Sequence, residues 1–396
     1  MLIKRKNPLL FFLAMSLGVL AAVTHFLWVT AWLALLSIYI LAKIVFRPAN
    51  VNLHTPIRSA TGLFFGLYLL VYLFLFEFRE DLIRSSFLWR PDERQYIEGV
   101  SYFLNYACFI FGFASCNNLL RNKNVKRFLL SCLISELILV LTGILSIDNP
   151  QYYSYFNFTL VPLLFLDKVN YSSRTIYLYI AISACIQLIF FGNRFPSLAL
   201  IFFAFCWYIY PFFLKRKVRH FYWFISFVVT LSILPLLYEP IIESTIVASF
   251  NSTRSNDSNS ALDKGLDGRL AIWPDIINSI VERPILGKCS NCSTEYFSNW
   301  SQSRDISSHN TFLEVIFRSG LIGLICIVSI FYSISKNSIT PSTASPYSRF
   351  LFSYISACMI FMSSNEFGFT QTFVANAIFW LIIGVCSGKA SENIKQ

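Results

Sequence analysis

The chain has 396 residues, of which 56% are hydrophobic and 13% are charged, and its net charge is +11. This apolar content exceeds what the core of a water-soluble protein needs, so the composition indicates an integral membrane protein. The positive charge does not indicate nucleic-acid binding, because its placement suits the cytoplasmic loops of such a protein and attraction to membrane lipids with anionic headgroups.

Apolar runs long enough to cross a bilayer recur along the whole chain. A helix needs roughly 20 residues, at ~1.5 Å each, to cross ~30 Å of hydrocarbon. We therefore predict an all-α, polytopic membrane domain over residues 1–396 with about twelve spans. In chain order these are Leu9–His25, Val29–Phe46, Ser59–Phe76, Gly99–Leu119, Phe128–Ile147, Phe156–Leu166, Ile176–Phe191, Phe195–Leu214, Phe221–Leu237, Thr311–Ser333, Phe350–Met362 and Thr370–Val385.

The loops between these runs differ in their basic residues, and this difference predicts the orientation of the chain. Lysine and arginine stay on the cytoplasmic side of short loops. They cluster at residues 4–6, 121–127 and 215–219, which the alternating spans place on one side, whereas the loop at 148–155 on the other side has none. Both termini are therefore expected in the cytoplasm.

Two outer segments, 77–98 and 239–310, are longer than a hairpin. The larger one holds most of the polar motifs of the chain. Apolar residues at helical spacing predict an amphipathic helix over Gly268–Glu282, lying near the membrane interface. Farther along the same segment, Cys289 and Cys292 have a spacing that allows either a local disulfide or two free thiols.

Three ionisable residues are predicted to share the outer face. Arg194 lies in a turn between two spans, Arg269 opens the loop helix, and His309 stands where the chain enters the next helix. Two guanidinium groups suit a diphosphate, and an imidazole with a reference pKa of about 6.5 suits a general base. We therefore predict a catalytic His309 with Arg194 and Arg269 binding the substrate, in a site that needs no metal or other cofactor.

Each of these residues also has a simpler interpretation. Arg194 is consistent with a side chain that extends to the headgroups, His309 with a helix cap, and Arg269 with a surface ion pair. Inside the following span, Arg318 is expected to face the helix bundle and to pair with an acid. Glu314, one helical turn away, and Glu366 are the two acids that could serve as this partner.

Four motifs, taken in order, resemble the O-antigen ligase/polymerase superfamily of bacterial envelopes. They are Gly-Asn-Arg-Phe-Pro-Ser-Leu at 192–198, Gly-Arg-Leu-Ala-Ile-Trp at 268–273, Arg-Pro-Ile-Leu-Gly at 283–287, and the segment from His-Asn to Leu-Ile-Gly at 309–323. The resemblance covers roughly residues 190–325. Gly287-Lys288-Cys289 departs from the Gly-x-Gly that relatives commonly have, which leaves the shape of the loop open.

The resemblance implies a metal-free inverting glycosyltransferase at the periplasmic face of the bacterial inner membrane. Its donor would be a glycan on undecaprenyl diphosphate, held by Arg194 and Arg269, and His309 would activate the acceptor hydroxyl, with Arg318 and Glu314 as supports. A polymerase uses another lipid-linked repeat unit as acceptor, and a ligase uses the lipid A core. Other polysaccharide assembly proteins are further expected partners.

A multi-span transporter or flippase for a lipid-linked sugar or another polar solute is the alternative. Twelve spans with both termini inside fit such a protein equally well. A transporter, however, places polar residues near the middle of the bilayer in broken helices. Here the ionisable residues gather in the outer segments, which favours the enzyme.

Overall fold

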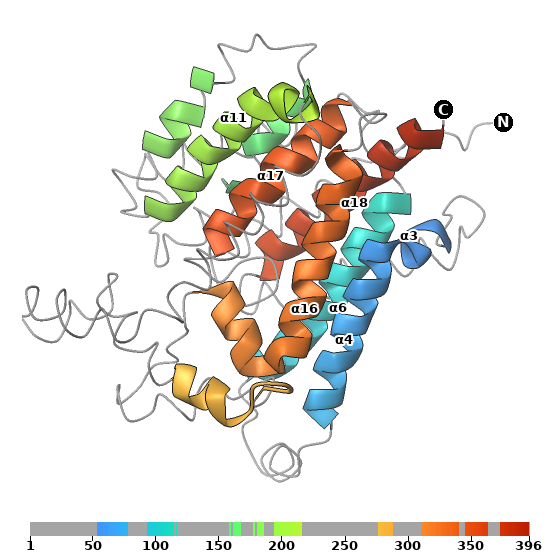
Figure 1. Ribbon diagram of the computed structural model, residues 1–396, viewed down its shortest axis with the longest axis vertical. Coiled ribbons are helices and arrows are strands. Elements are labelled where there is room, and N and C mark those ends of the chain that lie inside the picture. The colour runs from blue at the N-terminus through green and yellow to red at the C-terminus, as the bar shows by residue number, and fades with distance from the viewer. Residues whose placement is uncertain are drawn as a thin grey trace, which may run out of the picture.

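The regular elements of the described part of the protein are all helices (Figure 1). The computed structural model describes residues 54–77, 93–114, 116, 158–159, 161–167, 177–178, 180–185, 194–215, 276–287, 310–339, 345–362 and 373–395. The main elements are α3 (His54–Arg58), α4 (Ala60–Glu77), α6 (Glu93–Ala114), the 3₁₀ helix η2 (Val161–Asp167), α11 (Arg194–Lys215), α16 (Thr311–Ile339), α17 (Pro346–Met362) and α18 (Phe373–Lys395). These residues contain no strand, which confirms the predicted helical class for this part of the chain.

Several of these helices coincide with predicted spans. Among the described residues, one helical stretch, Thr311–Lys336, has the length and composition needed to cross a membrane. Shorter apolar helices occur at Ala60–Val71, Tyr102–Ala114, Pro196–Pro211 and Asn376–Ser391. The spans predicted at 9–25, 29–46, 128–147 and 221–237 lie outside the described residues, so the count of twelve stays a prediction. The predicted span Phe156–Leu166 is described only in part, and its residues 161–166 belong to the 3₁₀ helix η2 rather than to an α-helix.

Helices α4 and α16 pack against each other in opposite directions. Near the start of α4, the hydroxyl of Thr61 lies 2.9 Å from that of Ser333, near the end of α16. Farther along α4, the side chain of Tyr68 lies beside Ser319, in the first part of α16. The two helices thus run antiparallel, as the third and tenth of the predicted spans are expected to do.

Helices α6 and α18 run in the same direction and pack closely. The close packing is possible because the residues at their contact include glycines, which have no side chain. A Cβ added to Gly384 would overlap the carbonyl oxygen of Phe109, and one added to Gly112 would overlap that of Leu381. One turn later, Gly388 faces Phe113 in the same manner. Small residues allow this close approach of backbones in membrane helices, so any larger side chain would separate α6 from α18.

Helix α11 contains Pro211, and α17 compensates for the hydrogen bond that this proline cannot make. Proline has no backbone N–H, so the carbonyl of Trp207, four residues earlier, loses its helical donor. The Nε of Arg349 in α17 donates to that carbonyl at 2.6 Å. The guanidinium also lies over the indole ring of Trp207, 4.6 Å from its centroid. One arginine side chain therefore ties α17 to α11.

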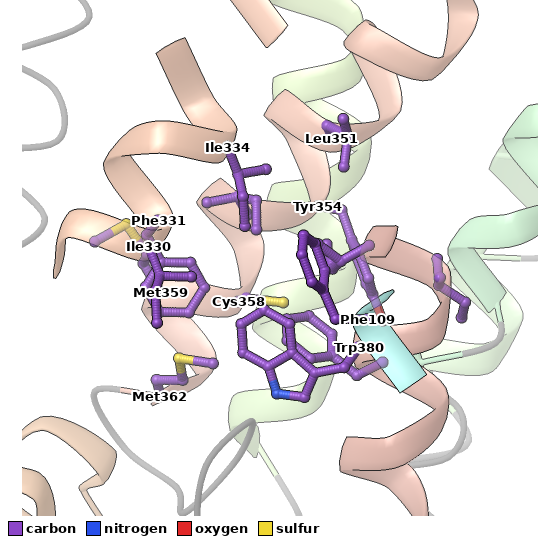
Figure 2. Close-up of a cluster of buried hydrophobic side chains, with 14 of the residues drawn as sticks. Phe109, Ile330, Phe331, Ile334, Leu351, Tyr354, Cys358, Met359, Met362 and Trp380 are labelled. Carbon is purple, nitrogen blue, oxygen red and sulfur yellow. The ribbon is translucent and has the colours of Figure 1, made fainter. Parts of the chain in front are cut away.

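The core lies where α4, α6, α16, α17 and α18 meet, and Trp380 of α18 is at its centre (Figure 2). The indole is fully buried. Its centroid lies 4.6 Å from that of Phe65, and it stacks against Phe331 at 6.2 Å. Phe109 meets it edge-on at 6.3 Å. Aromatic contacts with α4, α6 and α16 thus hold α18 against these three helices.

Candidate active site

The structure describes the three predicted site residues only in part. Arg194 is the first residue of α11, and only its backbone is described. Arg269 and His309 lie outside the described residues, as do Cys289 and Cys292. Whether the two arginines and the histidine converge therefore stays a prediction. The structure does describe the start of α16, immediately after His309, and residues 276–287 of the loop segment.

Asn310 caps the first turn of α16. Its side-chain Oδ1 accepts hydrogen bonds from the backbone N–H groups of Phe312 at 3.0 Å and Leu313 at 3.1 Å. Its carbonyl oxygen accepts the first helical bond, from Glu314 N at 2.9 Å. These bonds satisfy N–H groups that a helix start leaves without partners. The predicted helix start close to His309 and Asn310 is confirmed, and Asn310 is the cap.

Glu314 and Arg318 form the predicted ion pair. Arg318 Nε donates to Glu314 Oε1 at 2.6 Å, and the two side chains are only 2% and 3% exposed. The residues are one helical turn apart, which brings their side chains together. Two charges so deeply buried are tolerated because each neutralises the other, and removal of one would take this neutralising charge away. Tyr68 of α4 lies beside this Arg318.

Helix α16 is not one straight span, because it breaks at Gly320. Gly320 has φ 63° and ψ −164°, which is not helical. Figure 1 shows a short orange arm and a long one that meet at a sharp bend. The arms fold back on each other, since a Cβ on Gly323 would lie 3.4 Å from the side chain of Val315, eight residues earlier. The expected span Thr311–Ser333 therefore needs correction: only the long arm, residues 321–339, continues straight.

The Arg-Pro-Ile-Leu-Gly motif forms a turn, residues 283–287, that docks onto this bend. The carbonyls of Pro284 and Ile285 accept hydrogen bonds from Leu321 N at 2.8 Å and Ile322 N at 3.3 Å. These are the first N–H groups of the long arm, which the break at Gly320 deprives of helical partners. The turn thus caps the long arm, and we call this contact the loop–helix joint.

Two glycines make the loop–helix joint possible. Gly287 has φ 72°, and a Cβ there would lie 2.6 Å from the Arg318 carbonyl and from Gly320 N. A Cβ on Gly320 would overlap the carbonyl of Ile285. Both glycines therefore adopt a left-handed backbone conformation that other residues rarely adopt. Their backbones also lie closer to each other than a residue with a Cβ would allow. The sequence analysis did not predict this contact. Two features could have indicated it: the final glycine of the Arg-Pro-Ile-Leu-Gly motif and the Ser-Gly pair in α16.

The short arm is enclosed by protein. Every residue from Asn310 to Gly320 is buried. The predicted loop helix is described over residues 276–282 only. Ile276 and Ser279 are buried there, whereas Val281 and Glu282 are exposed. Two motif segments, 283–287 and 310–323, are thus held together at one end of the helix bundle.

The comparison with known families agrees with the motifs. Residues 163–328 match the family model described as O-antigen ligase. This range includes α11, the 283–287 turn and both arms of α16 up to residue 328. The predicted resemblance to the O-antigen ligase/polymerase superfamily is confirmed. No curated protein matches the chain.

Proposed function

We propose that this protein is a glycosyltransferase of surface polysaccharide synthesis. Residues 163–328 carry the O-antigen ligase pattern, which supports a membrane-associated enzyme of the ligase/polymerase type. The protein moves a glycan from undecaprenyl diphosphate to a sugar hydroxyl at the periplasmic face of the inner membrane. The observation that carries this proposal is the loop–helix joint, which attaches the motif-bearing loop to α16 immediately beyond His309.

The proposed reaction is a single displacement at the anomeric carbon. His309 takes the proton of the acceptor hydroxyl as its oxygen forms the new bond to that carbon. The bond from the same carbon to the diphosphate oxygen breaks, and undecaprenyl diphosphate leaves with the bonding electrons. Arg194 and Arg269 neutralise the charge that develops on the leaving group, a task for which fixed guanidinium groups are suited.

The buried part of α16 supports this assignment, because it holds the residue that follows His309 in the chain. That residue, Asn310, is held by its two cap bonds. The Glu314–Arg318 pair then anchors the same short arm inside the protein. A base positioned this way avoids the loss of rate, about 100-fold for a displacement near 1 Å, that a mobile group incurs.

The test uses purified full-length protein in detergent micelles with a lipid-linked glycan as the only donor. The wild-type protein is expected to lengthen or transfer the glycan, and to do so in EDTA as well, because Arg194 and Arg269 replace a metal in this proposal. His309→Ala and Arg269→Ala are expected to abolish transfer. Arg58→Ala serves as the control, because it removes an exposed arginine at the end of α3. This variant is expected to retain transfer.

The outcomes separate this proposal from its alternative. A flippase needs a bilayer with two sides and produces no new glycosidic bond in micelles, so a wild-type protein without transfer activity would favour the transporter. Transfer that persists in His309→Ala would exclude the assigned base. In a deletion strain, lipid A core bearing a single repeat unit indicates a polymerase, which we favour, and core without any O-antigen indicates a ligase.

A further inference from the structure

Large apolar side chains face outward on the 283–287 turn and the helix before it. The exposed fractions of Val281, Ile285 and Leu286 are 70%, 61% and 47%. The sequence places this segment in an outer loop, where water would surround these side chains. Exposure of apolar surface to water is unfavourable by about 25 cal/mol per Å², and contiguous apolar patches usually mark a binding surface. These side chains therefore call for an apolar partner.

The loop–helix joint holds this turn beside the exposed side of the long arm of α16. The hydrogen bonds from Leu321 N and Ile322 N hold the two backbones next to each other. On the long arm, Leu321 and Ile325 are also exposed, at 46% and 61%. Exposed apolar side chains thus occur on two backbone segments that are hydrogen-bonded to each other. We call the combined surface the apolar strip, made of Val281, Ile285, Leu286, Leu321 and Ile325.

The length of the long arm gives the depth of the turn. Lys336 is exposed near the end of α16, and the contact between Thr61 and Ser333 places Arg58 at the same end of the bundle. Basic side chains of this kind mark a membrane boundary. At ~1.5 Å per residue, the helix rises about 24 Å from Lys336 back to Gly320, and tilt shortens this distance. The hydrocarbon layer is ~30 Å thick, so the bend does not extend beyond it.

We propose that the apolar strip is immersed in the leaflet opposite Lys336 and contacts the acyl chains of bilayer phospholipids. The 283–287 turn is then a membrane-inserted part of the outer loop rather than a part in solution. Arg283, exposed at the start of the turn, lies where its guanidinium reaches the headgroup phosphates. The proposal concerns the position of the turn and holds independently of the reaction that the protein catalyses.

Site-specific photocrosslinking of the full-length protein tests this position. Benzoylphenylalanine replaces one residue at a time in protein reconstituted into vesicles of phosphatidylethanolamine and phosphatidylglycerol, and adducts are identified by mass spectrometry. The test sites are Ile285 and Leu286. Ile325 on the long arm is the lipid-exposed reference, and Glu282, exposed and charged on the same loop, is the matched polar control. Before reconstitution and irradiation, each variant is required to elute as a monodisperse peak, which shows that its fold is unchanged.

Ile285 and Leu286 are expected to form phospholipid adducts as Ile325 does, at least about fivefold above the yield at Glu282, since apolar faces enter the acyl region and charged positions do not. Adducts at Ile325 without adducts at either turn position would place the turn in water and overturn the proposal. Crosslinks from the turn to a second copy of the chain would show a protein interface and overturn it as well. Equal lipid yield at Glu282 would mean that the apolar strip is not the inserted element.

Discussion

Replacing Gly320 with alanine tests the loop–helix joint directly. Alanine adds one methyl group, so the change removes no charge, hydrogen-bonding side chain or apolar contact. It acts only on the backbone conformation of α16 and on the space between the bend and the 283–287 turn. Gly66→Ala in α4 is the matched control, because Gly66 is helical and the nearest atom to its added Cβ is the Tyr106 hydroxyl at an ordinary 3.4 Å.

The expected magnitude follows from two effects. The conformation at φ 63° and ψ −164° is essentially restricted to glycine, and a residue with a side chain there costs about 1–3 kcal/mol. The Cβ also displaces the carbonyl of Ile285, so the hydrogen bonds from Leu321 N and Ile322 N are lost. At about 0.5–1.5 kcal/mol each, they bring the total destabilisation to about 2–6 kcal/mol. Gly66→Ala, in contrast, is expected to stabilise by about 0.5–1 kcal/mol.

Two measurements on the purified variants check this reasoning. Titration with sodium dodecyl sulfate in mixed micelles gives the free energy of unfolding, and glycan transfer in detergent gives activity. Gly320→Ala is expected to lower both, with a loss of activity of about 100-fold if His309 shifts by about 1 Å, whereas Gly66→Ala retains both. Equal stability and activity in the two variants would show that the turn does not depend on Gly320.

Three further predictions concern contacts between and within helices. Glu314→Gln removes the carboxylate that neutralises the buried Arg318 charge, which is expected to cost about 3–5 kcal/mol of unfolding free energy, whereas replacing both residues by leucine costs less. Arg349→Leu removes the hydrogen bond to the Trp207 carbonyl and is expected to destabilise by about 1–3 kcal/mol. Pro211→Ala in that background is expected to recover part of the loss by restoring a backbone N–H. Gly384→Ala separates α6 from α18 and is expected to destabilise by about 1–3 kcal/mol.

The same detergent titration decides each case. A double leucine variant less stable than Glu314→Gln would show that the ion pair contributes more than mutual neutralisation. Additive losses in Arg349→Leu and Pro211→Ala would mean that the arginine does not replace the missing helical donor. Full stability of Gly384→Ala would contradict the close approach of α6 and α18.

The sequence predicted what depends on local spacing and missed what depends on distant segments meeting. The helical class, the helix start beside His309 and the Glu314–Arg318 pair all follow from residues within one or two turns. The break at Gly320 was missed because Thr311–Ser333 is apolar throughout, and hydropathy does not distinguish a straight helix from one that folds back.

The partner of the Arg-Pro-Ile-Leu-Gly motif was missed for a related reason. A turn can be predicted from proline and glycine, but its docking surface lies more than 30 residues later in the chain. The pairing of Arg349 with the carbonyl exposed by Pro211 was missed likewise, because nothing near either residue indicates the other. The convergence of Arg194, Arg269 and His309 is such a long-range prediction, and it has yet to be tested.

The glycine contact between α6 and α18 has a consequence for biogenesis. Gly384 follows Gly112 by about 270 residues, so in the predicted topology α6 enters the membrane long before α18 has been synthesised. At 5–20 residues per second this interval is roughly 15–55 s. During that time the groove of α6 that α18 later fills is open to lipid or to insertion chaperones. Chains that stop before residue 373 would keep it open, which makes them natural substrates for membrane quality-control proteases.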